Sequence, residues 1–206
     1  MTILSKNNQH GRSMIEMLGV LAIIGVLSVG GISGYSKAMA KFKLTKAQDQ
    51  ISMLLMNIRT AFATSPSYDG LTTQSSRDYN IAPGDMFGAA STQLNNAFGG
   101  QAYVYNCSSN ESVACVGDAA NNVQYFAISL TDLGREACVS LASSDWGTDG
   151  LIGMIVTPSG GTATTNYAAN LPLTPMGAGS AGTAGAGAGA QCGAKGVYNT
   201  ITWIYY

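Results

Sequence analysis

One acidic residue, Glu16, stands near the start of a long apolar segment. Residues 14–36 contain Glu16 and no other charged side chain, and the next charge follows at Lys37. A carboxylate within a membrane-spanning helix costs on the order of a few kcal/mol unless it is paired, and such residues usually have a function. Glu16 is therefore the first candidate functional residue of this chain.

The segment that carries Glu16 is long enough to cross a lipid bilayer. A helix rises about 1.5 Å per residue, so some twenty apolar residues span the roughly 30 Å hydrocarbon core of a membrane. We therefore predict a hydrophobic transmembrane helix over residues 12–36.

Four cysteines form the second group of residues that could react or bind a metal: Cys107, Cys115, Cys138 and Cys192. They contain no Cys-x-x-Cys pair, and the only histidine is His10, so a zinc site is not expected. In an oxidising compartment they would form disulfides, for which three pairings are possible; the alternative is four buried free thiols. We favour Cys107 with Cys115 and Cys138 with Cys192, whose long loop would contribute about 4 kcal/mol in the chain-entropy model.

No catalytic constellation is recognisable in the sequence. With His10 as the only histidine, the later residues offer no imidazole base to a serine or cysteine nucleophile. Asp145 and Asp149 flank Trp146, but this spacing is typical of a solvated turn rather than a carboxylate pair or a calcium loop. The sequence predicts neither an enzyme nor a cofactor or metal site.

The segment before the apolar helix has its own pattern. Residues 1–11 are mostly polar and end in Gly11, and Glu16 is the fifth residue counted from Arg12. A secretory signal peptide would instead be cleaved after its apolar region. The pattern closely resembles the class III signal of type IV prepilins and of the related secretion pseudopilins. The alternative is an uncleaved signal anchor on a periplasmic domain.

This resemblance implies a role for each of the three residues. A prepilin peptidase would remove residues 1–11 by cleaving after Gly11 and would methylate the new amino terminus at Arg12, a position that usually holds Phe or Met in the family. In the filaments of the family, the Glu of one subunit meets the terminal amine of its neighbour. Four residues separate Arg12 from Glu16, about 6 Å along a helix, so an axial step of that size would bring the two charges together. The alternative for Glu16 is a side chain that reaches the membrane interface.

The helix is predicted to continue beyond the membrane, as one element over residues 13–63. In its amphipathic second half, residues 37–63, apolar residues recur every three or four positions. These residues are Met39, Phe42, Ala47, Ile51, Leu54, Leu55, Ile58, Ala61 and Phe62. Ser65-Pro66 ends the helix, because proline disfavours helical geometry in the preceding residue. Residues 64–100 are predicted to be a connecting αβ-loop with one short helix.

The C-terminal part, residues 101–206, is predicted to be a sheet. Strands are expected at 101–105, 123–130, 151–157 and 197–206, and a short helix at 131–142 capped by Thr131. The fold class is α+β, with an antiparallel sheet on the second half of the long helix. Residues 125–130 leading to Leu133 and Cys138 resemble the type IVb pilins, which implies a D-region over residues 138–192. The Gly-Ala-rich residues 176–190 are predicted to form a mobile surface loop.

Lysines at the end of the apolar segment contradict the predicted topology. Lys37, Lys41, Lys43 and Lys46 follow the segment, and the positive-inside rule would place them in the cytoplasm. We nevertheless expect the head outside the cytoplasm, because the cysteines, the leader peptide of residues 1–11 and the family resemblance all indicate this location.

Composition completes the functional interpretation. Charged residues make up 10% of the chain and the formal net charge is −1, so no basic surface for nucleic acid is indicated. The predicted function is that of a type IVb-like major pilin. Before assembly the subunit is expected in the inner membrane with its head in the periplasm. It then joins an extracellular helical filament of identical subunits for adhesion, aggregation or motility. Its expected partners are the membrane, the prepilin peptidase and the pilus assembly machinery. Alternatives are a minor pilin or adhesin, a type II secretion pseudopilin, and an anchored periplasmic protein that does not polymerise.

Overall fold

The long N-terminal helix is the first element of the fold. A computed structural model of the chain describes residues 14–108, 115, 122–146, 150–160, 164–166, 191–193 and 196–206, the side chains of 164–166 excepted. Helix α1 (Met14–Ala61) ends two residues earlier than predicted, and its predicted start at residue 13 lies outside the described residues. The chain divides into two compact units, the first ending at Lys41 and the second covering Phe42–Tyr206.

The part of α1 within the second unit has one buried face. Ala47, Ile51, Leu54 and Ile58 are fully buried and Gln50 nearly so, at spacings of three and four residues that place them on one side of a helix. This confirms the amphipathic pattern at these positions. Phe42, which is 64% exposed, and Ala61, which is also exposed, were predicted to share this face and do not. After Ala61 the backbone continues as a turn, in which Ser65 N–H donates to the carbonyl of Phe62.

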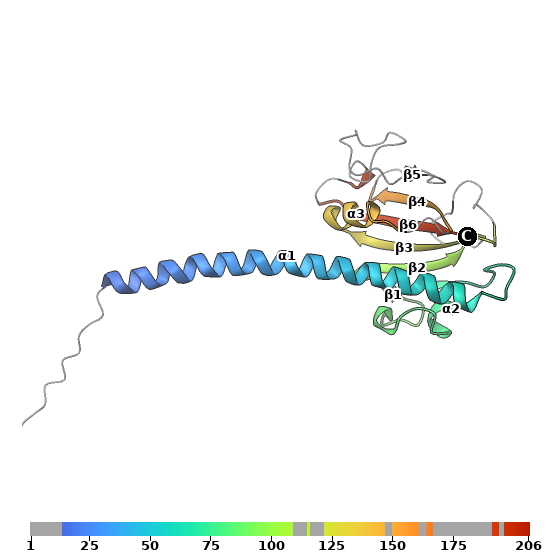
Figure 1. Ribbon diagram of the computed structural model, residues 1–206, viewed down its shortest axis with the longest axis horizontal. Coiled ribbons are helices and arrows are strands. Elements are labelled where there is room, and N and C mark those ends of the chain that lie inside the picture. The colour runs from blue at the N-terminus through green and yellow to red at the C-terminus, as the bar shows by residue number, and fades with distance from the viewer. Residues whose placement is uncertain are drawn as a thin grey trace, which may run out of the picture. The chain divides into compact units, whose positions relative to one another are not determined.

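An antiparallel sheet forms the head (Figure 1). Among the described residues it has six strands in the order β1-β2-β3-β6-β4-β5. Their bounds are β1 (Leu94–Asn95), β2 (Gln101–Asn106), β3 (Phe126–Leu133), β4 (Leu151–Pro158), β5 (Thr164–Asn166) and β6 (Asn199–Tyr205). The C-terminal strand β6 pairs with both β3 and β4, so the last residues of the chain lie in the middle of the sheet. The predicted α+β class is confirmed, while the short strands β1 and β5 were not predicted.

The prediction for residues 131–142 is wrong at its start. Strand β3 continues to Leu133, and helix α3 (Arg135–Ala142) begins only after Gly134, its N-cap residue. The Thr131 hydroxyl caps no helix, because it accepts a hydrogen bond from the Gln101 N–H at 3.0 Å and donates one to the Gln101 carbonyl at 3.2 Å. An irregularity in the pairing with β6 follows Leu130, and Asp132 there has φ +58°. Such bulges redirect a strand, here from the sheet into α3.

The two faces of the sheet belong to different clusters of buried side chains. The larger cluster contains the buried face of α1, α3 residues such as Leu141, and Phe126, Ile128 and Trp203 of the sheet. The alternate positions Ala127 and Ile204 belong to a second cluster, which also holds Tyr105, Cys107, Cys115 and Ile155. This alternation is the two-residue periodicity of a sheet with both faces covered.

The connection between α1 and β2 contains the short helix that the sequence predicts, α2 (Thr73–Asp78). It also contains the 3₁₀ turn η1 (Gly84–Met86) and the edge strand β1, which were not predicted. Helix α2 starts with a capping box in which Thr72 and Ser75 exchange side chain to backbone hydrogen bonds. The buried apolar residues Leu71, Ile81 and Met86 connect this segment to the larger cluster.

Candidate assembly site

The first unit has an apolar surface that is exposed to solvent in the isolated chain. Large apolar side chains are exposed along the whole helix from Met14 to Tyr35, for example Ile15 at 76%, Val26 at 75% and Leu27 at 68%. An 18-residue stretch of α1 has a mean hydropathy of 2.2, and by length and composition the helix could cross a membrane. Soluble monomers rarely expose so large an apolar surface, which normally marks a contact with lipid or with other proteins.

The polar groups of this helix suit an apolar environment. The hydroxyl of Ser28 donates to the Ile24 carbonyl at 2.7 Å, and that of Ser36 donates to the Ile32 carbonyl at 3.0 Å. Neither hydroxyl therefore leaves an unsatisfied donor where water is absent. Glu16 is the charged side chain of this part of the helix, and no hydrogen bond of this kind is found for it among the described residues.

Glu16 lies in the first turn of α1 and is exposed. A negative charge is favourable at this end of a helix, because the first backbone N–H groups have no partner within the helix. Its expected counterpart Arg12 and the processing residue Gly11 lie outside the described residues. The pairing of Glu16 with a neighbouring terminal amine therefore stays a prediction.

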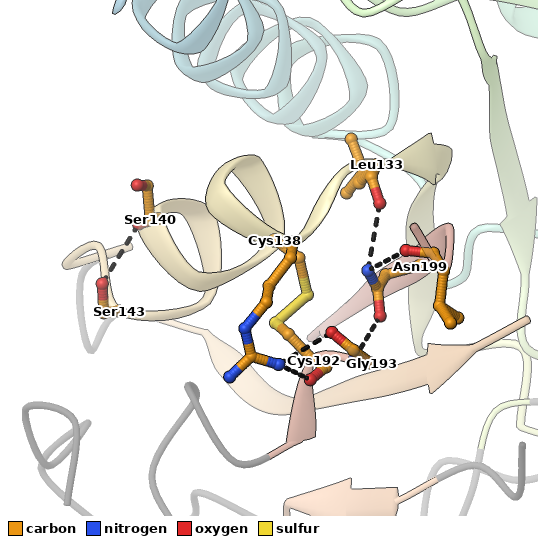
Figure 2. Close-up of a disulfide and its surroundings, with 9 residues drawn as sticks. Leu133, Cys138, Ser140, Ser143, Cys192, Gly193 and Asn199 are labelled. Atoms are coloured by element: carbon orange, nitrogen blue, oxygen red, sulfur yellow. Dashed lines mark hydrogen bonds between the residues drawn. A yellow bond between two sulfur atoms is a disulfide. The ribbon is translucent and has the colours of Figure 1, made fainter. Parts of the chain in front are cut away.

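The longer disulfide joins α3 to the segment before β6 (Figure 2). Cys138 is bonded to Cys192 across 54 residues of sequence, and both cysteines belong to the larger buried cluster. This is the pairing that we favour from the sequence. The Gly-Ala-rich residues 176–190 within this loop lie outside the described residues.

Hydrogen bonds hold the second cysteine in place. The buried Asn199 side chain donates to the Leu133 carbonyl at 3.1 Å and accepts from the Gly193 N–H at 2.7 Å, and Figure 2 shows it between these residues. The guanidinium of Arg135 donates to the carbonyls of Cys192 and Gly193 at 2.6 and 2.7 Å. No sequence pattern indicated Asn199 or Arg135, because their partners are backbone atoms that lie more than fifty residues away or in a turn.

The shorter disulfide closes a small loop after β2. Cys107 is bonded to Cys115 over a separation of 8 residues, again the favoured pairing, and both residues are buried in the second cluster. The two disulfides thus belong to opposite faces of the sheet.

Polar contacts fasten the connecting segment to α1. The Gln50 amide donates to Asp85 at 2.9 Å, and the Lys46 ammonium lies 3.1 Å from the same Asp85 oxygen. Burial would raise the pKa of Asp85, but the hydrogen bond from Gln50 and the charge and hydrogen bond of Lys46 outweigh it, so this pKa lies below its usual value. Further along α1, the Asn57 amide donates to the Ile81 carbonyl at 2.8 Å.

Arg77 organises the turn before β1. Its guanidinium donates to the carbonyls of Gly88, Ala90 and Gln93 at 2.8, 2.7 and 3.1 Å and lies 4.8 Å from the centre of the Phe87 ring. Arg77 was not predicted from the sequence, because a single arginine on a short helix has no distinguishing pattern.

The head also has a groove between α1 and the residues that follow α3. It measures about 680 Å³, and its walls include Ile51 and Leu55 of α1 and the ring of Trp146. Arg59 and Asp145 are the charged residues that line it. Within the described part of the chain, no group of three or more His, Cys, Asp or Glu residues could hold a metal ion.

A long helix that is apolar over its first part and packs its second part on an antiparallel sheet, with a disulfide-closed C-terminal region, defines the class of type IV pilins. The family model described as Bundlin matches residues 37–203 of this chain, and the chain therefore belongs to the bundlin family.

The chain is also similar to individual proteins. The chain is 27% identical over 147 residues to proteins named major structural subunit of bundle-forming pilus, from Escherichia coli O127:H6 (strain E2348/69 / EPEC) and from E. coli O111:H-. Each match covers 71% of this chain and 70% of the relative. Among solved structures, TcpA, a type IV pilin from Vibrio cholerae El Tor biotype, is 14% identical with a TM-score of 0.45, over 80% of this chain and 99% of TcpA.

Proposed function

We propose that this chain is the major structural subunit of a type IV pilus. The first part of α1 holds it in the inner membrane, with the head in the periplasm, and the same helix later packs with its copies in an extracellular filament for adhesion, aggregation or motility. Membership of the bundlin family and the names of the curated relatives support this role. They support a structural subunit rather than an enzyme.

The observation that carries the proposal is the exposed apolar surface of α1 up to Tyr35. Fully burying one large apolar side chain contributes about 1.5–3 kcal/mol relative to water, so this helix requires either lipid or other helices around it. Its glycines favour contact with other helices. A Cβ atom added at Gly19, Gly25, Gly30, Gly31 or Gly34 would meet nothing within 4 Å in the single chain, and small residues allow close approach between helices in apolar surroundings.

Glu16 would set the register between subunits. After the prepilin peptidase cleaves between Gly11 and Arg12, the new terminal amine of one subunit would meet the Glu16 carboxylate of the next, with the assembly machinery delivering each subunit. Away from water, the pair would neutralise two charges that are costly to bury alone. Such a pair contributes more to alignment than to net stability, because both groups lose their hydration.

The test is filament formation by a Glu16→Ala variant. We expect membrane insertion to persist and the yield of sheared surface filaments to fall at least tenfold, because one buried amine per subunit loses its counter-ion. Glu136→Ala is the matched control, since Glu136 is also an exposed glutamate in the first turn of a helix, α3. Abundant filaments from the Glu16 variant, counted by electron microscopy, would refute the assigned role.

Mass spectrometry of the same filaments tests the processing step. The expected subunit begins at Arg12 and carries one additional methyl group. A full-length subunit that remains in the membrane fraction, without surface filaments, would instead indicate an anchored protein that does not polymerise.

A further inference from the structure

The apolar part of α1 ends in an aromatic residue followed by two lysines. Tyr35 is 65% exposed, and Lys37 and Lys41 after it are exposed as well. At a rise of about 1.5 Å per residue, the helix covers roughly 35 Å from Met14 to Lys37, slightly more than the roughly 30 Å hydrocarbon core of a bilayer. A helix that crosses the membrane with Met14 at one surface therefore has Tyr35 and the lysines at the headgroups of the other.

The two lysines have no acidic partner on their own helix. They lie four residues apart and so share a face of α1, and the positions three and four residues from each hold no Asp or Glu. Within the described part of the chain, the ion pair found is that of Lys46 with Asp85, which involves neither lysine. Like charges at this spacing destabilise an isolated helix by about 0.2–0.5 kcal/mol, and a negative partner outside the helix would relieve this repulsion.

The neighbouring side chains suit the level of the headgroups. Tyrosine is enriched at membrane interfaces, where its ring faces the acyl chains and its hydroxyl faces water. Lysine side chains place their methylene groups along apolar surface and extend the ammonium group to the polar region. The Ser36 hydroxyl is already bonded to the Ile32 carbonyl, so it requires no partner from the lipid.

We propose that Lys37 and Lys41, together with Tyr35, bind anionic phospholipid headgroups at the periplasmic surface of the membrane while the subunit awaits assembly. This inference rests on the membrane stage of the proposed function. It gives a reason for lysines on the side of the membrane where the positive-inside rule disfavours them, because the charges contact lipid phosphates there. The role of Lys37 and Lys41 is therefore to attract anionic lipid, and not to set the orientation of the helix in the membrane.

The test measures which lipids the full-length chain retains. The chain is reconstituted in vesicles of equal parts phosphatidylglycerol and phosphatidylcholine, and native mass spectrometry gives the ratio of the two bound lipids. Each lysine near an anionic surface should favour the anionic lipid about fivefold at low salt, so Lys37→Gln with Lys41→Gln should lower the ratio by more than tenfold. Replacing both lysines by arginine should preserve the ratio.

Lys46→Gln is the matched control. It removes the same charge from the same helix, but the Lys46 ammonium is already paired with Asp85, so the lipid ratio should stay within twofold of that of the parent chain. An unchanged ratio in the double glutamine variant, or an equal loss in the control, would overturn the proposal.

Filament yield of the same variants separates this inference from the proposed function. If the parent chain prefers the anionic lipid but forms no filaments, the proposed function fails and the lipid contact stands. If the double glutamine variant keeps the lipid ratio and loses filaments, the lysines instead bind an acidic surface of a second copy, and the lipid proposal is overturned.

Discussion

The disulfide between Cys138 and Cys192 allows a quantitative test of how the head is stabilised. Its removal, by serine at both positions, frees a loop with a sequence separation of 54 residues in the unfolded chain. The chain-entropy relation gives a loss of about 4 kcal/mol at 25 °C for a loop of this length. This is a large part of the roughly 5–15 kcal/mol by which domains are usually stable.

The other disulfide provides an internal comparison. Cys107 and Cys115 are separated by 8 residues, for which the same relation gives about 2.5 kcal/mol. Because all four cysteines are buried, the cost of placing serine hydroxyls in the core is similar in the two double variants. The difference of about 1.7 kcal/mol should therefore reflect loop length.

Urea unfolding of the full-length chain in detergent measures this difference. Trp146 and Trp203 lie 5.0 Å apart, and Trp203 is fully buried, so tryptophan fluorescence should report the loss of the core next to α3. A reducing agent should destabilise the parent chain at least as much as either double variant. If the variant without the shorter bridge is as unstable as the variant without the longer one, loop entropy is not the main contribution and the reasoning is refuted.

Two further predictions concern pH. The Tyr205 hydroxyl is buried without a hydrogen-bond partner among the described residues, and burial raises its pKa well above the usual value near 10. Tyr205 of the unfolded chain therefore ionises first, so its contribution to stability falls as the pH rises above about 10. Burial also raises the pKa of Tyr68, so Tyr205→Phe should reduce this alkaline loss without abolishing it. In thermal unfolding at pH 7 the variant should be neutral or stabilising by about 1 kcal/mol. Asp85 has a lowered pKa in the folded chain, so its contribution to stability is complete above the unfolded pKa near 4 and is lost as the pH falls through the folded pKa. Asp85→Asn should reduce this loss of stability in acid by less than about 1 kcal/mol, because the ion pair with Lys46 is half exposed. An unchanged dependence of stability on acid pH would contradict the pairing.

Local sequence patterns were sufficient to predict the helices and strands whose periodicity is strong. The spacing of Ala47, Ile51, Leu54 and Ile58 predicted the buried face of α1, because a helix repeats every 3.6 residues whatever it packs against. The β-branched and aromatic residues near the C-terminus predicted β6 in the same way. Apolar length alone predicted that the first part of α1 is long enough to cross a membrane.

Long-range contacts decided what the sequence could not. Thr131 reads as a helix cap, yet it lies in β3 because its hydroxyl bonds Gln101 of the neighbouring strand. Arg77 and Asn199 bind backbone carbonyls that only the folded chain brings near them. The sequence by itself determined the long helix α1 and the four longer strands, since their periodicity and composition follow from neighbouring residues. The tertiary structure alone decided that β6 lies between β3 and β4, because strand order depends on contacts between segments distant in the chain.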